Sequence, residues 1–231
     1  MYGMYFDSTY LLVVIAMLVT LAASVYMSST FNKYQRVNAR INMTAADAAV
    51  RIMQAAGIDN VRVGRVAGNL TDHYAPTKKE LNLSDTTYSS SSIASIGVAA
   101  HEVGHAIQDN RAYGPLVLQM TVAPALSIVS QISLPLIIIG MILGLAKLFN
   151  LGIIAFSATL IYQVVTLPIE FDASKRAIQN LSELQILDED ELYGVKKVLT
   201  AAALTYVAAA ASTLLQILRF LLLSSAMRRR D

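Results

Sequence analysis

Two of the chain's three histidines stand four residues apart around a glutamate, in the pentapeptide His101-Glu102-Val103-Gly104-His105. On a helix, positions i and i+4 lie on one face, so both imidazoles can bind one Zn²⁺. Glu102 then stands beside the metal, where it can take a proton from an activated water. The spacing therefore predicts a hydrolytic zinc site with Glu102 as its general base. Because the motif is so short, the alternative interpretation is that this spacing occurs by chance on a surface helix that binds no metal.

A catalytic zinc site needs a third protein ligand and keeps a fourth position open for water. The chain has no cysteine, so only histidine and carboxylate side chains remain as plausible ligands. His73 precedes the motif on an expected strand or turn, and Glu170 ends a long uncharged run. We expect Glu170 to join His101 and His105, because a membrane hairpin would return it to their side. His73 is then a hydrogen-bonded or substrate-facing residue. The alternative to a metal ligand for Glu170 is a solvated carboxylate at a helix N-terminus.

The composition places these residues in a membrane protein. Of the 231 residues, 55% are hydrophobic and only 15% are charged, whereas roughly a quarter are charged in soluble domains. The net charge of +2 is small, and no basic block is interleaved with aromatic residues, which excludes a nucleic-acid partner. No Lys or Arg precedes the first apolar run, so we expect no cleavable signal peptide and a retained first span.

Four uncharged runs have the roughly 20 apolar residues that a membrane helix needs. The second run is too long for one straight span, and Pro124 and Pro135 are the expected bends, with the membrane part beginning near Val122. The predicted divisions are an N-terminal transmembrane span (1–32), a cytoplasmic α+β region with the motif helix (33–111), a transmembrane hairpin that turns at 147–152 (112–169), a second metal-site helix and loop (170–197) and a fourth hydrophobic helix with a basic end (198–231).

The region between the first two runs has the pattern of a small α+β unit. Thr44 and Asp47 resemble a capping box before an Ala-rich helix that Gly57 would end. Apolar and polar residues alternate at 61–63 and again at 81–83, which predicts two or three short strands.

The four serines at 89–92 can cap a helix that continues into the motif, and a flexible linker is the alternative. The predicted fold class is a mainly α multi-pass membrane protein. Its small α+β soluble region carries the HExxH helix.

Four segments of the chain resemble the YugP-type family of bacterial membrane zinc metallopeptidases, which is distantly similar to the HtpX-like group. They are HEVGHAIQ at 101–108, the upstream LTDHYAP and ELNLS, and the downstream TLPIEFDASKRA. The resemblance spans most of the chain and implies a zincin-like soluble region. In the HtpX-like group a Glu on a later helix completes the zinc site and an Asp four residues on supports it. Glu170 falls on that ligand, and Ser174 stands where the Asp would be.

The resemblance also implies that an edge strand binds the substrate by β-addition, and 74–83 is the expected segment. Gly104 would let another backbone approach the motif helix closely. A developing oxyanion needs a hydrogen-bond donor, and His73, Tyr74 and Tyr162 are the candidates.

The charges beside the first span predict its orientation. Lys33, Arg36 and Arg40 follow the span, whereas only Asp7 precedes it. The positive-inside rule then places the N-terminus outside and the motif in the cytoplasm. The hairpin would bring Glu170 back to the same side.

The fourth run does not fit this rule. If it crosses, Arg228 to Arg230 lie outside, so a helix that does not cross is the alternative. Small residues between Ala201 and Ala211 would allow close helix packing in either case. We expect the fourth run to cross the membrane.

The predicted function is a multi-pass endopeptidase of the cell membrane that uses Zn²⁺ to hydrolyse protein or peptide substrates at the cytoplasmic face. A noncatalytic zinc-containing scaffold or regulatory protein is the alternative, and it would need a fourth protein ligand such as His73. A transporter would need ionisable groups inside its spans, where we count only Lys147, at a turn.

Overall fold

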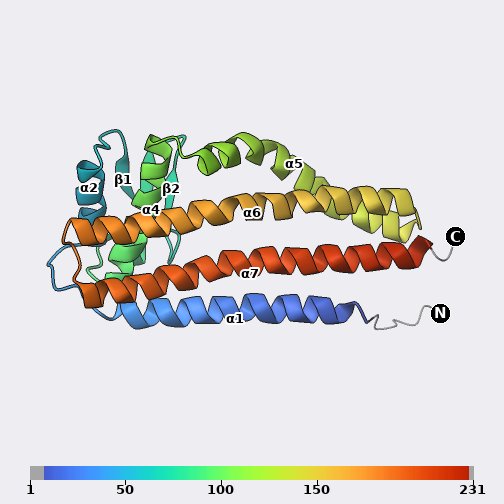
Figure 1. Ribbon diagram of the computed structural model, residues 1–231, viewed down its shortest axis with the longest axis horizontal. Helices are drawn as coiled ribbons and strands as arrows, with labels where there is room; N and C mark the ends of the chain where they lie inside the picture. The colour runs from blue at the N-terminus through green and yellow to red at the C-terminus, as the bar shows by residue number, and fades with distance from the viewer. Residues whose placement is uncertain (1–7, 229–231) are drawn as a thin grey trace. The chain divides into compact units, whose positions relative to one another are not determined.

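The computed structural model describes residues 8–228, within which seven helices and three strands follow one another (Figure 1). The elements are α1 (Tyr10–Gln35), α2 (Ala45–Ala55), β1 (Arg62–Val66), β2 (His73–Ala75), β3 (Glu80–Ser84), α3 (Asp85–Tyr88), α4 (Ile93–Asn110), α5 (Gly114–Ile142), α6 (Ala146–Glu183) and α7 (Glu189–Arg228). Asp7, Arg229 and Arg230, on which part of the orientation argument depends, lie outside the described residues.

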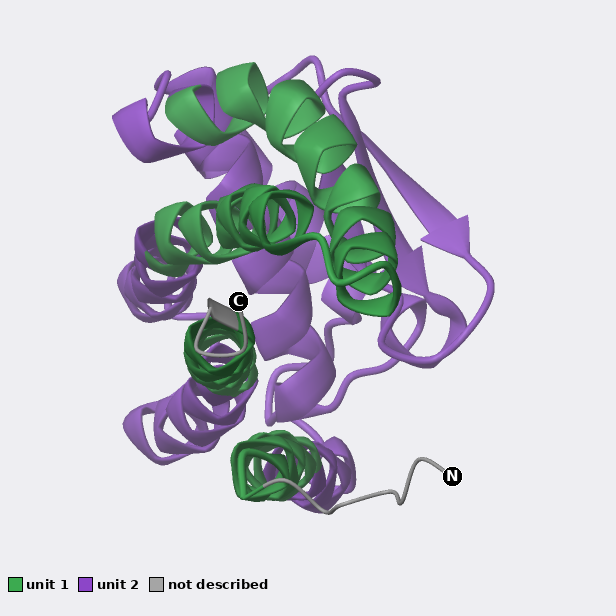
Figure 2. Ribbon diagram, turned by 90° about the vertical axis from the view of Figure 1, so that its right-hand side faces the viewer, with its two compact units in different colours: residues 1–24, 118–167, 205–231 green, residues 25–117, 168–204 purple. Residues whose placement is uncertain are grey.

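The chain divides into two compact units, coloured separately in Figure 2. Unit 1 consists of residues 1–24, 118–167 and 205–231, and unit 2 consists of residues 25–117 and 168–204. The sheet and the short helices α2, α3 and α4 belong to unit 2. The predicted fold class is confirmed at this level, because the protein is mostly helical with one small sheet.

Four helices are long and apolar enough to cross a membrane, namely α1, α5, α6 and α7. The most apolar 18-residue windows of these helices have a mean hydropathy between 1.8 and 2.3. Only 6% of that window is buried in α1 and 39% in α7, so most of this apolar surface points outward. Outward apolar surface on this scale suits a lipid environment rather than water.

The hairpin turns earlier than predicted. Helix α5 ends at Ile142 and α6 begins at Ala146, so Lys147 and Gly152 lie inside α6 and not in the turn. Gly144 makes the turn with a φ of +66°, a left-handed conformation that glycine adopts without a steric penalty at a helix end. The expectation of a bent second run is confirmed, because α5 contains Pro124 and Pro135 and curves along its length (Figure 1).

Helix α6 does not end at Pro168, since it continues to Glu183. Glu170 is therefore a mid-helix residue, and the alternative of a carboxylate at a helix N-terminus is wrong. Helix α7 is likewise longer than the predicted fourth run. It includes Arg219, so Lys147 is not the only ionisable residue within the candidate membrane helices. The Arg219 guanidinium lies over the ring of Tyr10, 4.7 Å from its centroid.

The strands of unit 2 are arranged in the order β1-β3-β2. Strand β1 pairs with β3 in parallel, and β2 pairs with β3 antiparallel, with Tyr74 opposite Leu81. Leu81 and Leu83 on the central strand are fully buried in the core, which they share with Ile52 of α2 and Val103 of α4. The sheet thus rests against the helix that carries the motif.

Local sequence signals fix the ends of α2 and α4. The capping box between Thr44 and Asp47 is formed, and Gly57 has a φ of +69° just after α2. The Ser92 hydroxyl accepts a hydrogen bond from the Ser95 amide at 3.1 Å, so the serine run caps α4 and the linker alternative is wrong. The whole motif consequently lies within one helix.

Candidate metal centre

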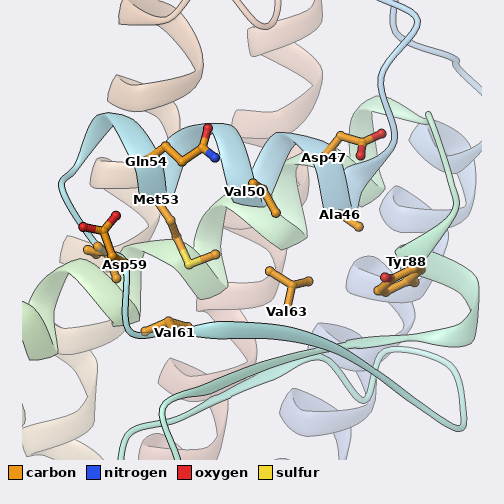
Figure 3. Close-up of a pocket in the computed structure, with 10 residues that line it drawn as sticks. Ala46, Asp47, Val50, Met53, Gln54, Asp59, Val61, Val63 and Tyr88 are labelled. Atoms are coloured by element: carbon orange, nitrogen blue, oxygen red, sulfur yellow. The ribbon is translucent and has the colours of Figure 1, made fainter.

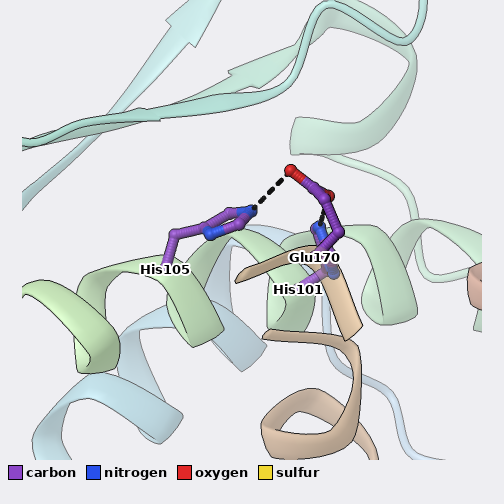
Figure 4. A group of neighbouring side chains, drawn as sticks. All are labelled: His101, His105 and Glu170. Atoms are coloured by element: carbon purple, nitrogen blue, oxygen red, sulfur yellow. Dashed lines mark ion pairs between the residues drawn. The ribbon is translucent and has the colours of Figure 1, made fainter. Parts of the chain in front are cut away.

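Helices α4 and α6 bring His101, His105 and Glu170 together (Figure 4). One ligand atom from each residue can be chosen so that all three lie within 4.8 Å of one another. The Nε2 atom of His101 is 3.3 Å from Glu170 Oε2, and the Nε2 atom of His105 is 3.9 Å from Glu170 Oε1. The three side chains are at most 16% exposed. The two imidazoles therefore face one carboxylate in a nearly enclosed position.

A glycine allows the two helices to approach this closely. A Cβ atom on Gly104 would lie 2.6 Å from the Ala173 carbonyl oxygen and 3.0 Å from the Ala173 Cα atom. Both contacts are with backbone, which cannot move aside as a side chain can. Gly104, between the two histidines, thus permits the close approach that the sequence predicted.

The donor set and its spacing fit Zn²⁺. Zinc binds imidazole nitrogen and carboxylate oxygen at 2.0–2.2 Å, so two donors in a tetrahedral site lie about 3.4 Å apart. The observed nitrogen–oxygen distances of 3.3 Å and 3.9 Å lie near this separation. Two imidazoles and one carboxylate form a set typical of catalytic zinc, in which the fourth position is open.

Each histidine has a hydrogen-bond partner on its other ring nitrogen. His101 Nδ1 lies 3.2 Å from the Ser174 hydroxyl, and His105 Nδ1 lies 3.0 Å from Gln108 Oε1. When Nδ1 carries the proton and donates it to such a partner, the Nε2 lone pair is free to bind a metal. In that tautomer the Ser174 hydroxyl is the acceptor for His101.

Gln108 is a residue that the sequence reasoning did not single out. Its side chain is fully buried, and its Nε2 atom donates to the Ile169 carbonyl and to Asp172 Oδ2, each at 2.8 Å. One amide therefore orients His105 and also joins α4 to the part of α6 that carries Glu170. The signal was its position three residues after His105, because i and i+3 share a helix face.

We predict that Gln108→Leu lowers zinc affinity by about 10–100-fold, the usual cost of losing a partner of a metal-ligating histidine. Leucine keeps the volume but offers no acceptor to His105 Nδ1 and no donor to Asp172. Competition with a chromophoric chelator in detergent measures the affinity. Gln54→Leu on the exposed face of α2 is the matched control (Figure 3), and equal affinities in the two variants would contradict the assigned role.

Glu102 lies beside the cluster and is held by the sheet. The carboxylate is only 8% exposed, and its Oε2 atom accepts a hydrogen bond from the Tyr74 amide at 2.9 Å. Burial by itself would lower the pKa of His101, but the hydrogen bond with Glu170 and the negative charges of Glu102 and Glu170 raise that pKa above its ordinary value. Glu102 is therefore close enough to act electrostatically on the first histidine.

The Tyr74 hydroxyl is already engaged elsewhere. It donates to Asp109 Oδ2 at 2.6 Å, and the Lys79 ammonium lies 2.6 Å from the same oxygen. Burial and the hydrogen bond to Asp109 raise the pKa of Tyr74 well above its usual range. Strand β2 is thus tied to α4 at two points, through the amide of Tyr74 to Glu102 and through its hydroxyl to Asp109.

The other two oxyanion candidates are not part of the cluster. The His73 ring lies 2.9 Å from the Thr71 carbonyl through Nδ1 and 3.4 Å from the Asn82 amide through Nε2. Tyr162 belongs to unit 1, whereas the cluster belongs to unit 2. Among the described residues, His73 is not a member of the ligand cluster.

The expected edge segment 74–83 needs a correction. Its second half lies in β3, the central strand, which has partners on both sides. Of this segment only β2 is at an edge of the sheet, and the Tyr74 amide donates to Glu102 rather than to β3. The hydrophobic alternation at 81–83 indicated a strand but could not indicate its place in the sheet.

Comparison with known proteins agrees with this geometry. Residues 9–225 match the family described as "Putative neutral zinc metallopeptidase". The chain is also 45% identical over 197 residues to the "Putative membrane protease YugP" of Bacillus subtilis (strain 168), an alignment that covers 85% of this chain and 88% of that protein. No solved structure matches the chain. On the extent of these two matches, the chain belongs to the neutral zinc metallopeptidase family.

Proposed function

We propose that this protein is a membrane-embedded, zinc-dependent endopeptidase that hydrolyses peptide bonds in protein or peptide substrates. One observation carries the proposal. His101, His105 and Glu170 form a three-ligand cluster, and Glu102 lies on the same helix as the two histidines. The family membership and the protease name of the Bacillus subtilis relative support the same reaction class.

In this proposal His101, His105 and Glu170 hold the metal. Bound zinc would supply Lewis acidity, which polarises the scissile carbonyl and lowers the pKa of water. Glu102 takes a proton from the attacking water and passes it to the leaving amine. The Tyr74 amide keeps the Glu102 carboxylate in place, while Ser174 and Gln108 hold the two imidazoles in the required tautomer.

A closed structural zinc site receives less support. It requires a fourth protein ligand, and the candidate cluster among residues 8–228 contains two histidines and one glutamate. His73, the fourth ligand that this alternative would need, has both ring nitrogens beside other partners. The arrangement favours a site that leaves one position for water and substrate.

We further propose that the site faces the cytoplasm of a cell whose membrane is crossed by α1, α5, α6 and α7. The cluster of Lys33, Arg36 and Arg40 after the apolar part of α1 supports this orientation. Substrate would lie along the outer edge of β2, next to Glu102. Unit 2 contains all three proposed ligands, so the site needs no residue from unit 1.

The test is hydrolysis by the purified protein in detergent. We expect wild type to cleave an unfolded protein such as casein, to stop after treatment with a metal chelator, and to recover on addition of Zn²⁺. Recovery with zinc separates metal removal from unfolding. Cleavage that continues after complete removal of the metal would contradict the proposal.

A further inference from the structure

The helix pair α5–α6 in unit 1 contains a cavity that is separate from the metal-ligand residues. Its volume is about 380 Å³, and it is lined by Ala123, Leu126, Ser127 and Ser130 of α5 and by Thr159 and Tyr162 of α6. Four of these six residues carry hydroxyl groups, and none is charged. Both helices have the composition of membrane spans, where hydrogen-bonding groups are costly unless they find partners. The cavity is therefore a mainly apolar pocket whose wall also offers hydroxyl groups.

Two serine hydroxyls of the lining, those of Ser127 and Ser130, each accept one hydrogen bond. Thr159 donates to Ser130 at 3.2 Å, and the Gln131 amide donates to Ser127 at 3.1 Å. Ser127 and Ser130 accept these bonds, so their own hydroxyl hydrogens can be donated to a further group. The lining can thus both donate to an occupant and accept from it.

An orphaned acceptor lies on the same face of α6. Gln163 Oε1 is buried and has no hydrogen-bond partner among the described residues. Gln163 follows Thr159 by four residues, so both lie on one side of the helix. A buried carbonyl oxygen without a donor is costly in an apolar environment. Gln163 does not line the cavity, but its orphaned oxygen shows that the polar groups on this side of α6 are not all satisfied within the described residues.

We propose that this cavity binds a stretch of substrate polypeptide inside the membrane, through the backbone amides of a locally unwound helix or through a polar side chain. Peptide units offer both donors and acceptors, whereas acyl chains offer neither and lipid ester groups only accept. No Lys or Arg lines the cavity, so an anionic lipid headgroup finds no counter-charge. Pro124 lies between two lining residues and removes one helix hydrogen bond of α5, which loosens the wall at that point.

This inference rests on the proposed peptidase function and names its substrate class as proteins with a membrane-embedded segment. Tyr162 of the cavity and Glu170 of the metal cluster belong to the same helix and are eight residues apart. The cavity and the third proposed metal ligand are thus carried by one continuous helix.

Two substrates with one cleavage sequence test the inference. One is a short soluble peptide, and the other carries the same sequence beside a transmembrane helix, reconstituted with the enzyme in phosphatidylcholine vesicles. We expect Ala123→Phe, which fills the cavity, to lower kcat/KM for the membrane substrate at least about tenfold and to leave the soluble peptide unaffected. Ile128→Phe, at a lipid-facing position of α5 that is 64% exposed, should change neither rate.

An equal loss for both substrates, or no loss for either, would overturn the inference. A loss for the membrane substrate that depends on lipid composition and is reproduced by Ile128→Phe would also overturn it, since a lipid effect would then explain the result. Thr159→Val keeps the side-chain volume and removes the hydroxyl, and it should give the same selective loss. This variant is the test if Ala123→Phe disturbs the fold.

A crosslinking experiment separates this inference from the catalytic proposal, because it needs no turnover. In a Glu102→Gln protein, a photoreactive benzoyl-phenylalanine in place of Leu126 should crosslink to the substrate's transmembrane segment, and the same group in place of Ile128 should not. Equal crosslinking at the two positions would contradict the binding site even if the protein proves to be a peptidase. Crosslinking at position 126 in the absence of any cleavage by wild type would contradict the proposed peptidase function but would support the proposed binding site.

Discussion

Replacing Glu102 with Gln should lower the hydrolysis of a peptide substrate by about 10²–10⁴-fold, the usual contribution of a general base. The amide has the size of the carboxylate but cannot take a proton from water. Its carbonyl oxygen can still accept the hydrogen bond that the Tyr74 amide now donates to Glu102 Oε2. We therefore expect β2 and the zinc content to be unchanged while the reaction fails.

The initial rate of peptide cleavage and the zinc content of the same sample are the measurements. Glu183→Gln is the control, since Glu183 is an exposed residue of α6 that is bonded to Gln179 and is not part of the cluster. Unchanged hydrolysis by the Glu102→Gln protein would show that another group acts as the base. Loss of zinc in this variant would instead assign Glu102 a role in metal binding.

Much of unit 2 could be predicted from the sequence because local signals determine it. The Thr44–Asp47 capping box, the glycine after α2 and the serine cap of α4 each satisfy backbone groups within a few residues. The motif helix follows from the same kind of signal. These interactions depend little on the rest of the chain, so the sequence is sufficient to identify them.

The turn of the hairpin was predicted in the wrong place for a physical reason. Lys147 is the only charge between α5 and the middle of α6, and a charge is commonly a sign of a turn between membrane spans. A lysine near a helix end can extend its ammonium group to the polar interface, however, so it can belong to the helix itself. Gly144, with its left-handed conformation, was the stronger signal.

Other contacts between elements distant in the sequence, unlike that of Glu170 with the motif, could not be predicted from one chain. Nothing in the order of residues shows that β3 lies between β1 and β2, or that Gln108 bonds to α6 across 61 residues. The bond of Ser174 to His101 likewise spans 73 residues. The resemblance to a family with an acid at that position indicated where to look but not that a hydroxyl would serve.

Replacing Glu170 with Ala should remove zinc from the protein. Glu170 is the only acidic member of the ligand cluster, and its two oxygens face the two Nε2 atoms. Without it, a doubly charged ion would lie in a largely buried position with only two neutral imidazoles, and desolvation of the ion would not be offset. The proposed peptidase activity should be lost together with the metal.

Glu170→Ala is also informative because Glu170 is far from the motif in sequence. A zinc ion held by the motif alone, or by the motif and His73, would survive the substitution. Glu183→Ala, thirteen residues further along α6, changes a carboxylate of the same helix without touching the cluster and is the matched control. Thermal unfolding in detergent shows whether each variant remains folded.

In the proposed function, α4 and α6 together form one zinc site. Elemental analysis of the purified wild-type protein, beside His101→Ala and Glu170→Ala, tests it most directly. We expect about one zinc per chain in wild type and in Glu183→Ala, and almost none in the other two variants. Full zinc content in a folded Glu170→Ala protein would contradict it.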